Sequence, residues 1–291
     1  MTVIRKSVSV PVFRRRVKIP ALFLLAVLLV MTALTAASIG AVSIPLGDIL
    51  SFDLSEQQQA VLSSIRFPRV LLAVIVGASL AISGSAMQGL FRNPLADPGL
   101  IGIAASAALA VAIVIVLAGP ISGFFGLYGL SFAAFAGALI ACFLIFRLAR
   151  LTGGFSVTYM LLTGIAINAL AGAGVGVLTF LSDDQQLRTL TFWTMGSLGG
   201  ALWPSVIVVS TIVIPASIIL IRNARELNVL LLGENEAKYL GVDAERLKRT
   251  IVICTALSVG AAISVSGIIG FVGLVVPHLI RLTLGPDHRL L

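Results

Sequence analysis

Residues 66–94 read RFPRVLLAVIVGASLAISGSAMQGLFRNP, and no charged side chain occurs between Arg69 and Arg92. The run between these arginines contains small and apolar residues almost throughout. A stretch of about 20 apolar residues is long enough to cross the hydrocarbon core of a bilayer as an α-helix. The sequence therefore predicts a transmembrane helix over residues 70–90.

Seven further apolar runs are spread along the chain. Of its 291 residues, 58% are hydrophobic and only 11% are charged, and the mean hydropathy is +1.10. A soluble domain of this length could not bury so much apolar surface, so the composition predicts an all-α polytopic membrane protein. We expect eight transmembrane segments, the remaining ones being residues 19–39, 100–117, 124–146, 156–181, 202–221, 251–267 and 268–284.

The first apolar run follows a basic segment, residues 1–18. Small residues at Ala36 and Ala37 leave open a cleaved signal peptide. A length of about 20 residues favours a transmembrane helix. We divide the chain into a basic N-terminus, residues 1–18, and a membrane domain, residues 19–291.

The charge distribution argues against nucleic acid as a partner. The net charge is +8, but the basic residues lie in loops between apolar runs instead of on one folded face. Cys142 and Cys254 have no disulfide or metal-site spacing, and His278 and His288 form no ligand pair. The sequence also lacks a phosphate-binding GxxxxGK[ST] loop. We therefore predict no metal, no cofactor and no nucleic acid.

The basic residues also predict the orientation in the membrane. With a cytoplasmic N-terminus, 17 of the 20 Lys and Arg residues lie in inner segments. The outer loops hold only Arg66, Arg69 and Arg188. Cytoplasmic loops of membrane proteins carry an excess of Lys and Arg, so we expect the N-terminus to be cytoplasmic.

Residues 222–249, RNARELNVLLLGENEAKYLGVDAERLKR, form the longest charged interruption between apolar runs. Glu236 and Ala237 are followed by Gly241, a spacing that predicts a short helix stopped by a left-handed glycine. Asp243 would cap a second short helix over residues 243–249. We expect a compact cytoplasmic knob that contacts a soluble partner.

Small residues recur every four positions in the run 156–181. Such spacing places them on one helix face, where they allow close packing of helices in lipid. The alternative to plain packing is a face that lines a pathway or meets a second subunit. The residues concerned are Gly164, Asn168, Gly172 and Gly176.

Three stretches resemble the FecCD family of permeases, the membrane subunits of bacterial ABC importers for iron–siderophores, haem and cobalamin. They are RFPR at 66–69, RNPLADPGLIG at 92–102 and SGIIGFVGLVVPHLIRL at 266–282. The likeness covers the chain from about residue 40 to its end. It implies a type II ABC importer permease fold, and structural roles in the last two stretches for Asn93, Pro94, Pro98, Gly267, Gly270, Gly273, Pro277 and His278. His278 is expected at a helix end.

The resemblance also implies roles for the loops. Arg66 and Arg69 would dock an extracytoplasmic substrate-binding protein, although plain anchoring at the membrane edge is the alternative. Glu236, Ala237 and Gly241 would enter a cleft of a cytoplasmic ATPase. The expected assembly has two permease subunits, alike or different, and two ATPase subunits in the cytoplasmic membrane of a bacterium. The expected cargo is an iron–siderophore, with cobalamin and haem left open, and the permease itself would not be an enzyme.

Members of this family have about ten spans, so the chain is expected to be truncated after the eighth. Two other functions stay open. An ion-coupled carrier would need ionisable groups within its spans, and no Asp, Glu, Lys or Arg lies mid-span in this sequence. An intramembrane serine protease could use Ser85 as the nucleophile and His278 as the base.

Overall fold

The computed structural model describes residues 13–51, 53–118, 123–149 and 156–289, and all regular secondary structure in these ranges is helical. A π-helical turn (Leu62–Arg66) leads into α4, and a 3₁₀ turn (Pro98–Ile101) precedes α5. The α-helices are α1 (Phe13–Ser38), α2 (Leu46–Ser51), α3 (Glu56–Val61), α4 (Phe67–Phe91), α5 (Ile103–Leu117), α6 (Gly123–Ala149), α7 (Val157–Leu181), α8 (Asp184–Met195), α9 (Trp203–Arg222), α10 (Ala224–Leu230), α11 (Glu234–Tyr239), α12 (Ala244–Ser266) and α13 (Val272–Leu284).

Each predicted apolar run coincides with a helix, and six helical segments are long and apolar enough to cross a membrane. These six contain α1, α4, α6, α7, α9 and α12. The other two apolar helices, α5 and α13, have 15 and 13 residues. At 1.5 Å per residue, helices of this length span about 20 Å, less than the hydrocarbon core. The structure therefore supports a multi-pass membrane protein, and the count of eight spans stays a prediction.

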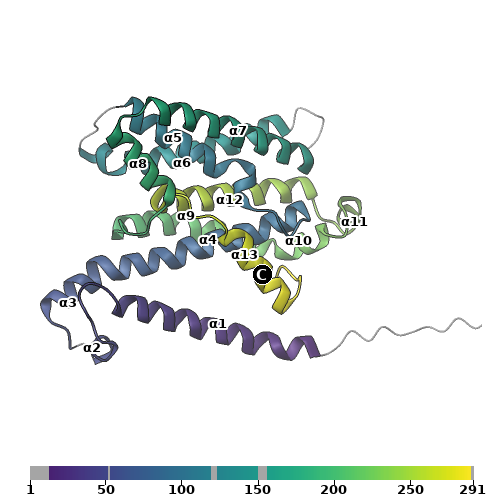
Figure 1. Ribbon diagram of the computed structural model, residues 1–291. Helices are drawn as coiled ribbons and strands as arrows, with labels where there is room; N and C mark the ends of the chain where they lie inside the picture. Colours follow the sequence, from purple (N-terminus) through teal and green to yellow (C-terminus); the bar gives the residue numbers. More distant parts are fainter. Residues whose placement is uncertain (1–12, 52, 119–122, 150–155, 290–291) are drawn as a thin grey trace, which may run out of the picture.

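The bundle is arranged around α4, which contacts α9, α12 and α13. A second group, α5, α6 and α7, joins it through the contacts of α5 and α6 with α12. Figure 1 shows the long helices running between two ends of the molecule, with α2, α3 and α8 at one end and α10 and α11 at the other. We call these the α8 end and the α11 end.

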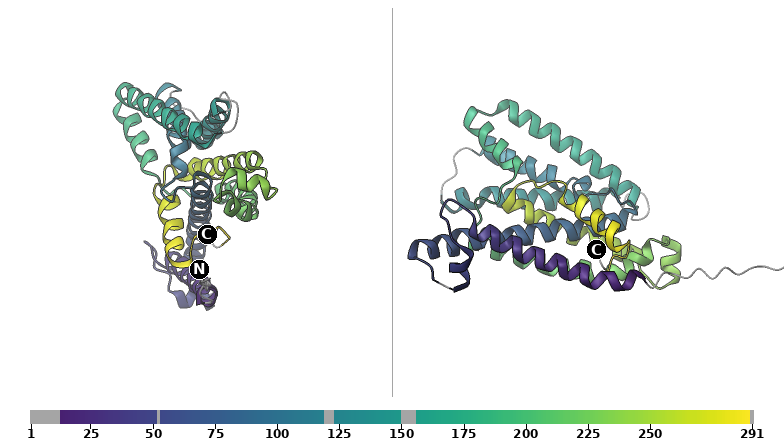
Figure 2. Two further views of the ribbon diagram at one scale, coloured as in Figure 1. Left: turned by 90° about the vertical axis from the view of Figure 1, so that its right-hand side faces the viewer. Right: turned by 60° about the horizontal axis from the view of Figure 1, so that its bottom comes forward.

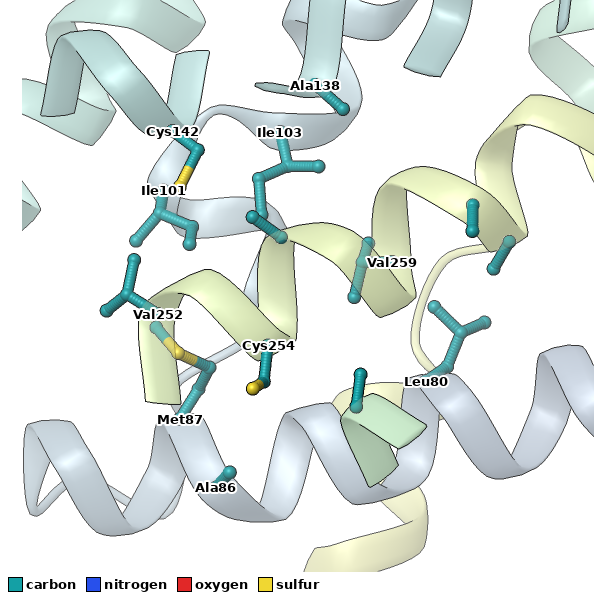
Figure 3. Close-up of a cluster of buried hydrophobic side chains, with 14 of the residues drawn as sticks. Leu80, Ala86, Met87, Ile101, Ile103, Ala138, Cys142, Val252, Cys254 and Val259 are labelled. Carbon is teal, nitrogen blue, oxygen red and sulfur yellow. The ribbon is translucent and has the colours of Figure 1, made fainter. Parts of the chain in front are cut away.

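The core lies where α4 meets α12. Met87 of α4 and Val252 of α12 are fully buried, and Cys254 is nearly so. Figure 3 shows these side chains between the two helices, with Ile101 of the 3₁₀ turn and Ile103, the first residue of α5, above them. The cysteines are free thiols within this apolar packing, as their sequence context predicts.

Gly84 sets how closely α13 approaches α4. A Cβ atom built on Gly84 would lie 1.8 Å from the carbonyl oxygen of Gly273, so a larger side chain at this position would force α4 and α13 apart. Both residues are buried. Gly84 of the apolar run 70–90 and Gly273 of the motif at 266–282 thus bring two helix backbones into direct contact, as small residues do at helix interfaces in membranes.

The first helix, α1, lies at the edge of the bundle (Figure 1). In both orientations of Figure 2 and in Figure 1, α1 runs along the side of the bundle, and most of its apolar side chains are exposed. An apolar groove of about 930 Å³ lies between α1 and α4, closed on one side by Val272 and Val276 of α13. Because this groove separates α1 from α4, the polar contacts that hold α1 lie at the α8 end and are described below.

Candidate functional site

The polar segment 222–249 folds into a knob at the α11 end of the bundle (Figure 1). It contains α10, α11 and the first turns of α12. The predicted short helix before Gly241 is confirmed as α11. The predicted second short helix over 243–249 is wrong: Asp243 does cap a helix, with its side chain accepting from the Arg246 amide at 3.0 Å, but that helix is α12, which continues to Ser266. The sequence prediction also missed α10.

Gly241 ends α11 through a Schellman motif. Its φ is +82°, in the left-handed region that glycine adopts without strain. The Gly241 amide donates to the Lys238 carbonyl at 3.0 Å, and the Val242 amide donates to the Ala237 carbonyl at 2.9 Å. These two bonds close a tight turn between α11 and α12, and this turn fixes the angle between the two helices.

Two contacts tie α11 to the bundle. Ala237 is fully buried. Lys248 of α12, whose side chain is only 4% exposed, pairs with Glu234 of α11 at 2.6 Å. A cation this deeply buried needs a close anionic partner, because an unpaired charge in the interior is costly. The pair therefore holds α11 in place against α12.

The outward face of the knob is partly apolar. Tyr239 is 90% exposed and Leu240 is 63% exposed, both in the last turn of α11, and Leu232 is 67% exposed. Glu236 is exposed as well, whereas Ala237 faces inward, so Ala237 can act on a partner only by holding α11. The sequence analysis missed Tyr239 and Leu240. For Tyr239 a signal was available: it lies two residues after Ala237 and therefore on the opposite side of the short helix.

At the α8 end, the structure separates the two arginines of the RFPR motif. Arg66 is only 7% exposed. Its guanidinium donates to the carbonyls of Ala37 at 2.6 Å and Ser38 at 2.7 Å, and also to that of Val42. Arg66 thus anchors the C-terminal end of α1. Arg69 is exposed and donates to the Gly199 carbonyl at 2.9 Å, so of the two arginines in this motif Arg69 is the one that offers its charge to the surface.

The corner after α4, at residues 92–102, is held by two local side-chain hydrogen bonds. Arg92 ends α4 in the left-handed region with φ of 50°, and the Asn93 side chain accepts from the Leu95 amide at 2.9 Å. The Asp97 side chain accepts from the Gly99 amide at 2.7 Å, just before Pro98 starts the 3₁₀ turn. Pro94 lies inside the turn that the first of these bonds closes.

One half of the small-residue face of α7 packs against this corner. Gly164 is buried, and the side-chain amide of Asn168 (Nδ2) donates to the Gly99 carbonyl at 3.1 Å. Gly172 and Gly176 are exposed, with open space beside both. Helix packing within the chain therefore accounts for the first two residues of the face.

The motif at 266–282 ends one helix and positions the next. Gly267 ends α12 with φ of +66°, Gly270 lies in the turn that follows, and Pro277 is buried inside α13. The prediction that His278 lies at a helix end is wrong. It lies six residues before Leu284, in the middle of α13, because α13 continues past the proline.

The pairing of Ser85 with His278 is also wrong. The imidazole near the Ser85 hydroxyl belongs to His288, whose Nδ1 lies 3.4 Å from Oγ. Burial and the charge of Arg281 lower the pKa of His288 to about 4, so the ring is a weak base. The cavity beside Ser85 measures about 40 Å³, too small for a peptide. Among the described residues, no cluster of His, Cys, Asp and Glu could hold a metal ion.

Comparison with known proteins gives a consistent result. A sequence profile of the FecCD transport family matches residues 25–291. The hemin transport system permease protein HmuU of Yersinia pestis is 49% identical over 265 residues, which cover 91% of this chain and 79% of that protein. The cobalamin import system permease protein BtuC of Halobacterium salinarum is 42% identical over 242 residues, covering 83% of this chain and 64% of the relative.

A solved structure extends the likeness to the fold. It is a chain of an ABC transporter assigned to the metal-chelate type, in an inward-facing conformation. The two chains superpose with a TM-score of 0.82 at 33% sequence identity, over 93% of this chain and 83% of the other.

Proposed function

The chain belongs to the FecCD transport family, and we propose that it is the permease subunit through which an ABC importer moves a bulky metal chelate into a bacterial cell. Its relatives are ABC permeases, so the chain is a membrane transport subunit. One observation supports the coupling of transport to a separate ATPase. The α11 end carries a short helix that is fixed to the bundle through Ala237 and Glu234 and exposes Tyr239, and Leu240 directly after it, to solvent.

We propose a different partner for each end of the molecule. Two ATPase subunits would receive the knobs of two permease subunits, and closure on ATP would move the helices attached to each knob. An extracytoplasmic binding protein would deliver the chelate at the α8 end, near Arg69. Charge pairing there would orient the encounter and increase its rate more than its affinity. The exposed half of the α7 face, Gly172 and Gly176, is where the second permease subunit would meet this one.

We propose haem as the first cargo to test. The hemin permease of Yersinia pestis shares 49% identity over 91% of this chain, against 42% over 83% for the cobalamin permease of Halobacterium salinarum. Cobalamin is the second choice, and an iron–siderophore is the third. The apolar, weakly charged spans suit a bulky chelate whose selection is made mainly by the binding protein.

The proposal is tested by uptake into proteoliposomes that hold this chain with its ATPase, with binding protein on the delivery side. We expect ATP-dependent uptake of hemin, and none with a nonhydrolysable analogue. Uptake of cobalamin in place of hemin would change the proposed cargo and leave the assignment as an ABC permease in place. Uptake driven by a proton or sodium gradient without ATP would replace the permease by an ion-coupled carrier.

The serine protease is not retained as a second function. Ser85 faces His288 in a cavity of about 40 Å³, and its replacement by alanine should leave uptake nearly unchanged.

A further inference from the structure

The turn that follows α13 binds the knob directly. In this turn, Asp287 and His288 both contact one side chain of α10, that of Asn228. The Asn228 Nδ2 atom donates to Asp287 Oδ1 at 2.7 Å, and the Asn228 Oδ1 atom accepts from the His288 backbone amide at 3.0 Å. Both ends of one amide are thus used on residues about 60 positions away in the sequence.

Arg289 orients the carboxylate in this contact. Its Nη2 atom lies 2.6 Å from Asp287 Oδ2, and its Nε atom lies 3.0 Å from both carboxylate oxygens. Hydrogen bonds from Arg289 lower the pKa of Asp287 well below its usual range, so the group is ionised when it accepts from Asn228.

The same turn also contacts α4. The His288 side chain is 7% exposed and lies beside Ser85 of α4 and Leu227 of α10. A Cβ atom on Gly89 would lie 2.8 Å from the His288 ring and 3.2 Å from a Leu227 methyl group. Gly89 therefore lets the end of α4 rest against the ring and against α10 at once. His288 fills the space between the knob and α4.

The neighbouring residue of α4 binds α13. Gln88 is 1% exposed; its Oε1 atom accepts from Arg281 Nη2 at 2.9 Å, and its Nε2 atom donates to the Leu274 carbonyl at 3.2 Å. Around one turn of α4, polar contacts thus join this helix to α13, and the turn after α13 joins both to the knob.

We propose that residues 285–289 form a clasp through which movement of the knob reaches α4, with Asn228 and His288 as its positioning residues. The inference rests on the proposed function. α10 contacts α4 directly, and the clasp adds hydrogen bonds from the turn after α13 to this apolar contact. The clasp thereby makes α10 move together with the part of α4 at the α11 end, and α4 is the helix that contacts α9, α12 and α13.

Asn228→Ala tests the clasp in the reconstituted transporter with its ATPase and binding protein. Both bonds to the turn are lost, so we expect uptake per ATP hydrolysed to fall by about tenfold while the ATPase stays bound and active. Asn223→Ala is the matched control, since within the described residues the Asn223 side-chain amide donates to the nearby Ile219 carbonyl at 2.7 Å and makes no hydrogen bond to the turn after α13. The cargo is whichever of hemin and cobalamin the native transporter takes up.

A charge exchange separates a positioning role from a general loss of stability. Asn228→Asp alone places two carboxylates together and should uncouple uptake from ATP hydrolysis. Adding Asp287→Asn restores one donor and one acceptor, so coupling should recover in the double variant. Unchanged coupling in Asn228→Ala, equal loss in Asn223→Ala, or no recovery in the double variant would overturn the clasp. A native transporter without ATP-dependent uptake would instead contradict the proposed function.

Discussion

Arg66 and Arg69 lie one helical turn apart at the start of α4, yet their surroundings give them different tasks. Arg66 satisfies carbonyls at the end of α1, which a helix terminus otherwise leaves without intrahelical partners. Arg69 is exposed beside Gly199. The sequence identified both as scarce basic residues of one motif but could not separate them, because the acceptors of Arg66 lie 24 to 29 positions away.

We predict that alanine at these two positions changes two different properties, stability at Arg66 and association with the binding protein at Arg69. Arg66→Ala should lower the free energy of unfolding by about 3 kcal/mol, since buried carbonyls lose a charged donor. Arg69→Ala should leave stability unchanged and slow association of the binding protein several-fold at low salt. Thermal unfolding in detergent and association kinetics at two salt concentrations measure both. Normal stability of Arg66→Ala would contradict the anchoring role, and unchanged association of Arg69→Ala would contradict docking.

At the scale of elements, the close contact between α4 and α13 depends on a glycine, because any side chain at Gly84 would collide with the backbone of α13. The sequence analysis identified a small-residue face in the run 156–181, whereas the closest helix approach involves Gly84 of α4, which lies against the Gly273 backbone. Which glycine meets which helix could not be read from the sequence, because spacing gives a helix face but not its partner. The same limit hid α10, a helix of seven residues whose place is set by tertiary contacts.

Gly84→Ala and Gly77→Ala form a matched pair on α4. The added methyl group at Gly84 would lie 1.8 Å from the Gly273 carbonyl oxygen, whereas nothing lies within 4 Å of a Cβ atom at Gly77. We predict that Gly84→Ala destabilises the bundle by about 3 kcal/mol through overpacking and lowers the yield of folded protein. Gly77→Ala should behave like the native chain. Fluorescence-detected size exclusion and thermal unfolding distinguish the two, and equal behaviour would contradict the close approach of α4 and α13.

For the whole molecule, composition was sufficient to predict an all-helical membrane protein, and every apolar run became a helix. Helix length was not predictable from the apolar runs alone. The run 268–284 loses its first residues to the turn before α13, and the run 251–267 gains the polar turns that begin at Ala244. Polar helix starts have no hydropathy signal, so caps such as Asp243 mark such boundaries better than apolarity does.

The orientation can be tested with two single cysteines. The native Cys142 and Cys254 are buried, which leaves a low background. Asn235 of α11 and Gln185 of α8 are both exposed, at opposite ends of the bundle. Among described residues, the basic side chains cluster at the α11 end, so we predict that this end is cytoplasmic. In intact spheroplasts a membrane-impermeant maleimide should label Gln185→Cys and not Asn235→Cys, and the reverse pattern would invert the assignment.

The coupling of the knob to an ATPase is tested most directly by co-purification in detergent. Tyr239→Arg places a charge on the exposed apolar tip of α11 without backbone strain, and Gly200→Arg places the same charge near the α8 end, where a Cβ atom would have nothing within 4 Å. We predict that the ATPase is retained by the native chain and by Gly200→Arg and is lost from Tyr239→Arg. Retention by Tyr239→Arg at the native level would contradict the assignment of α11 as the ATPase contact.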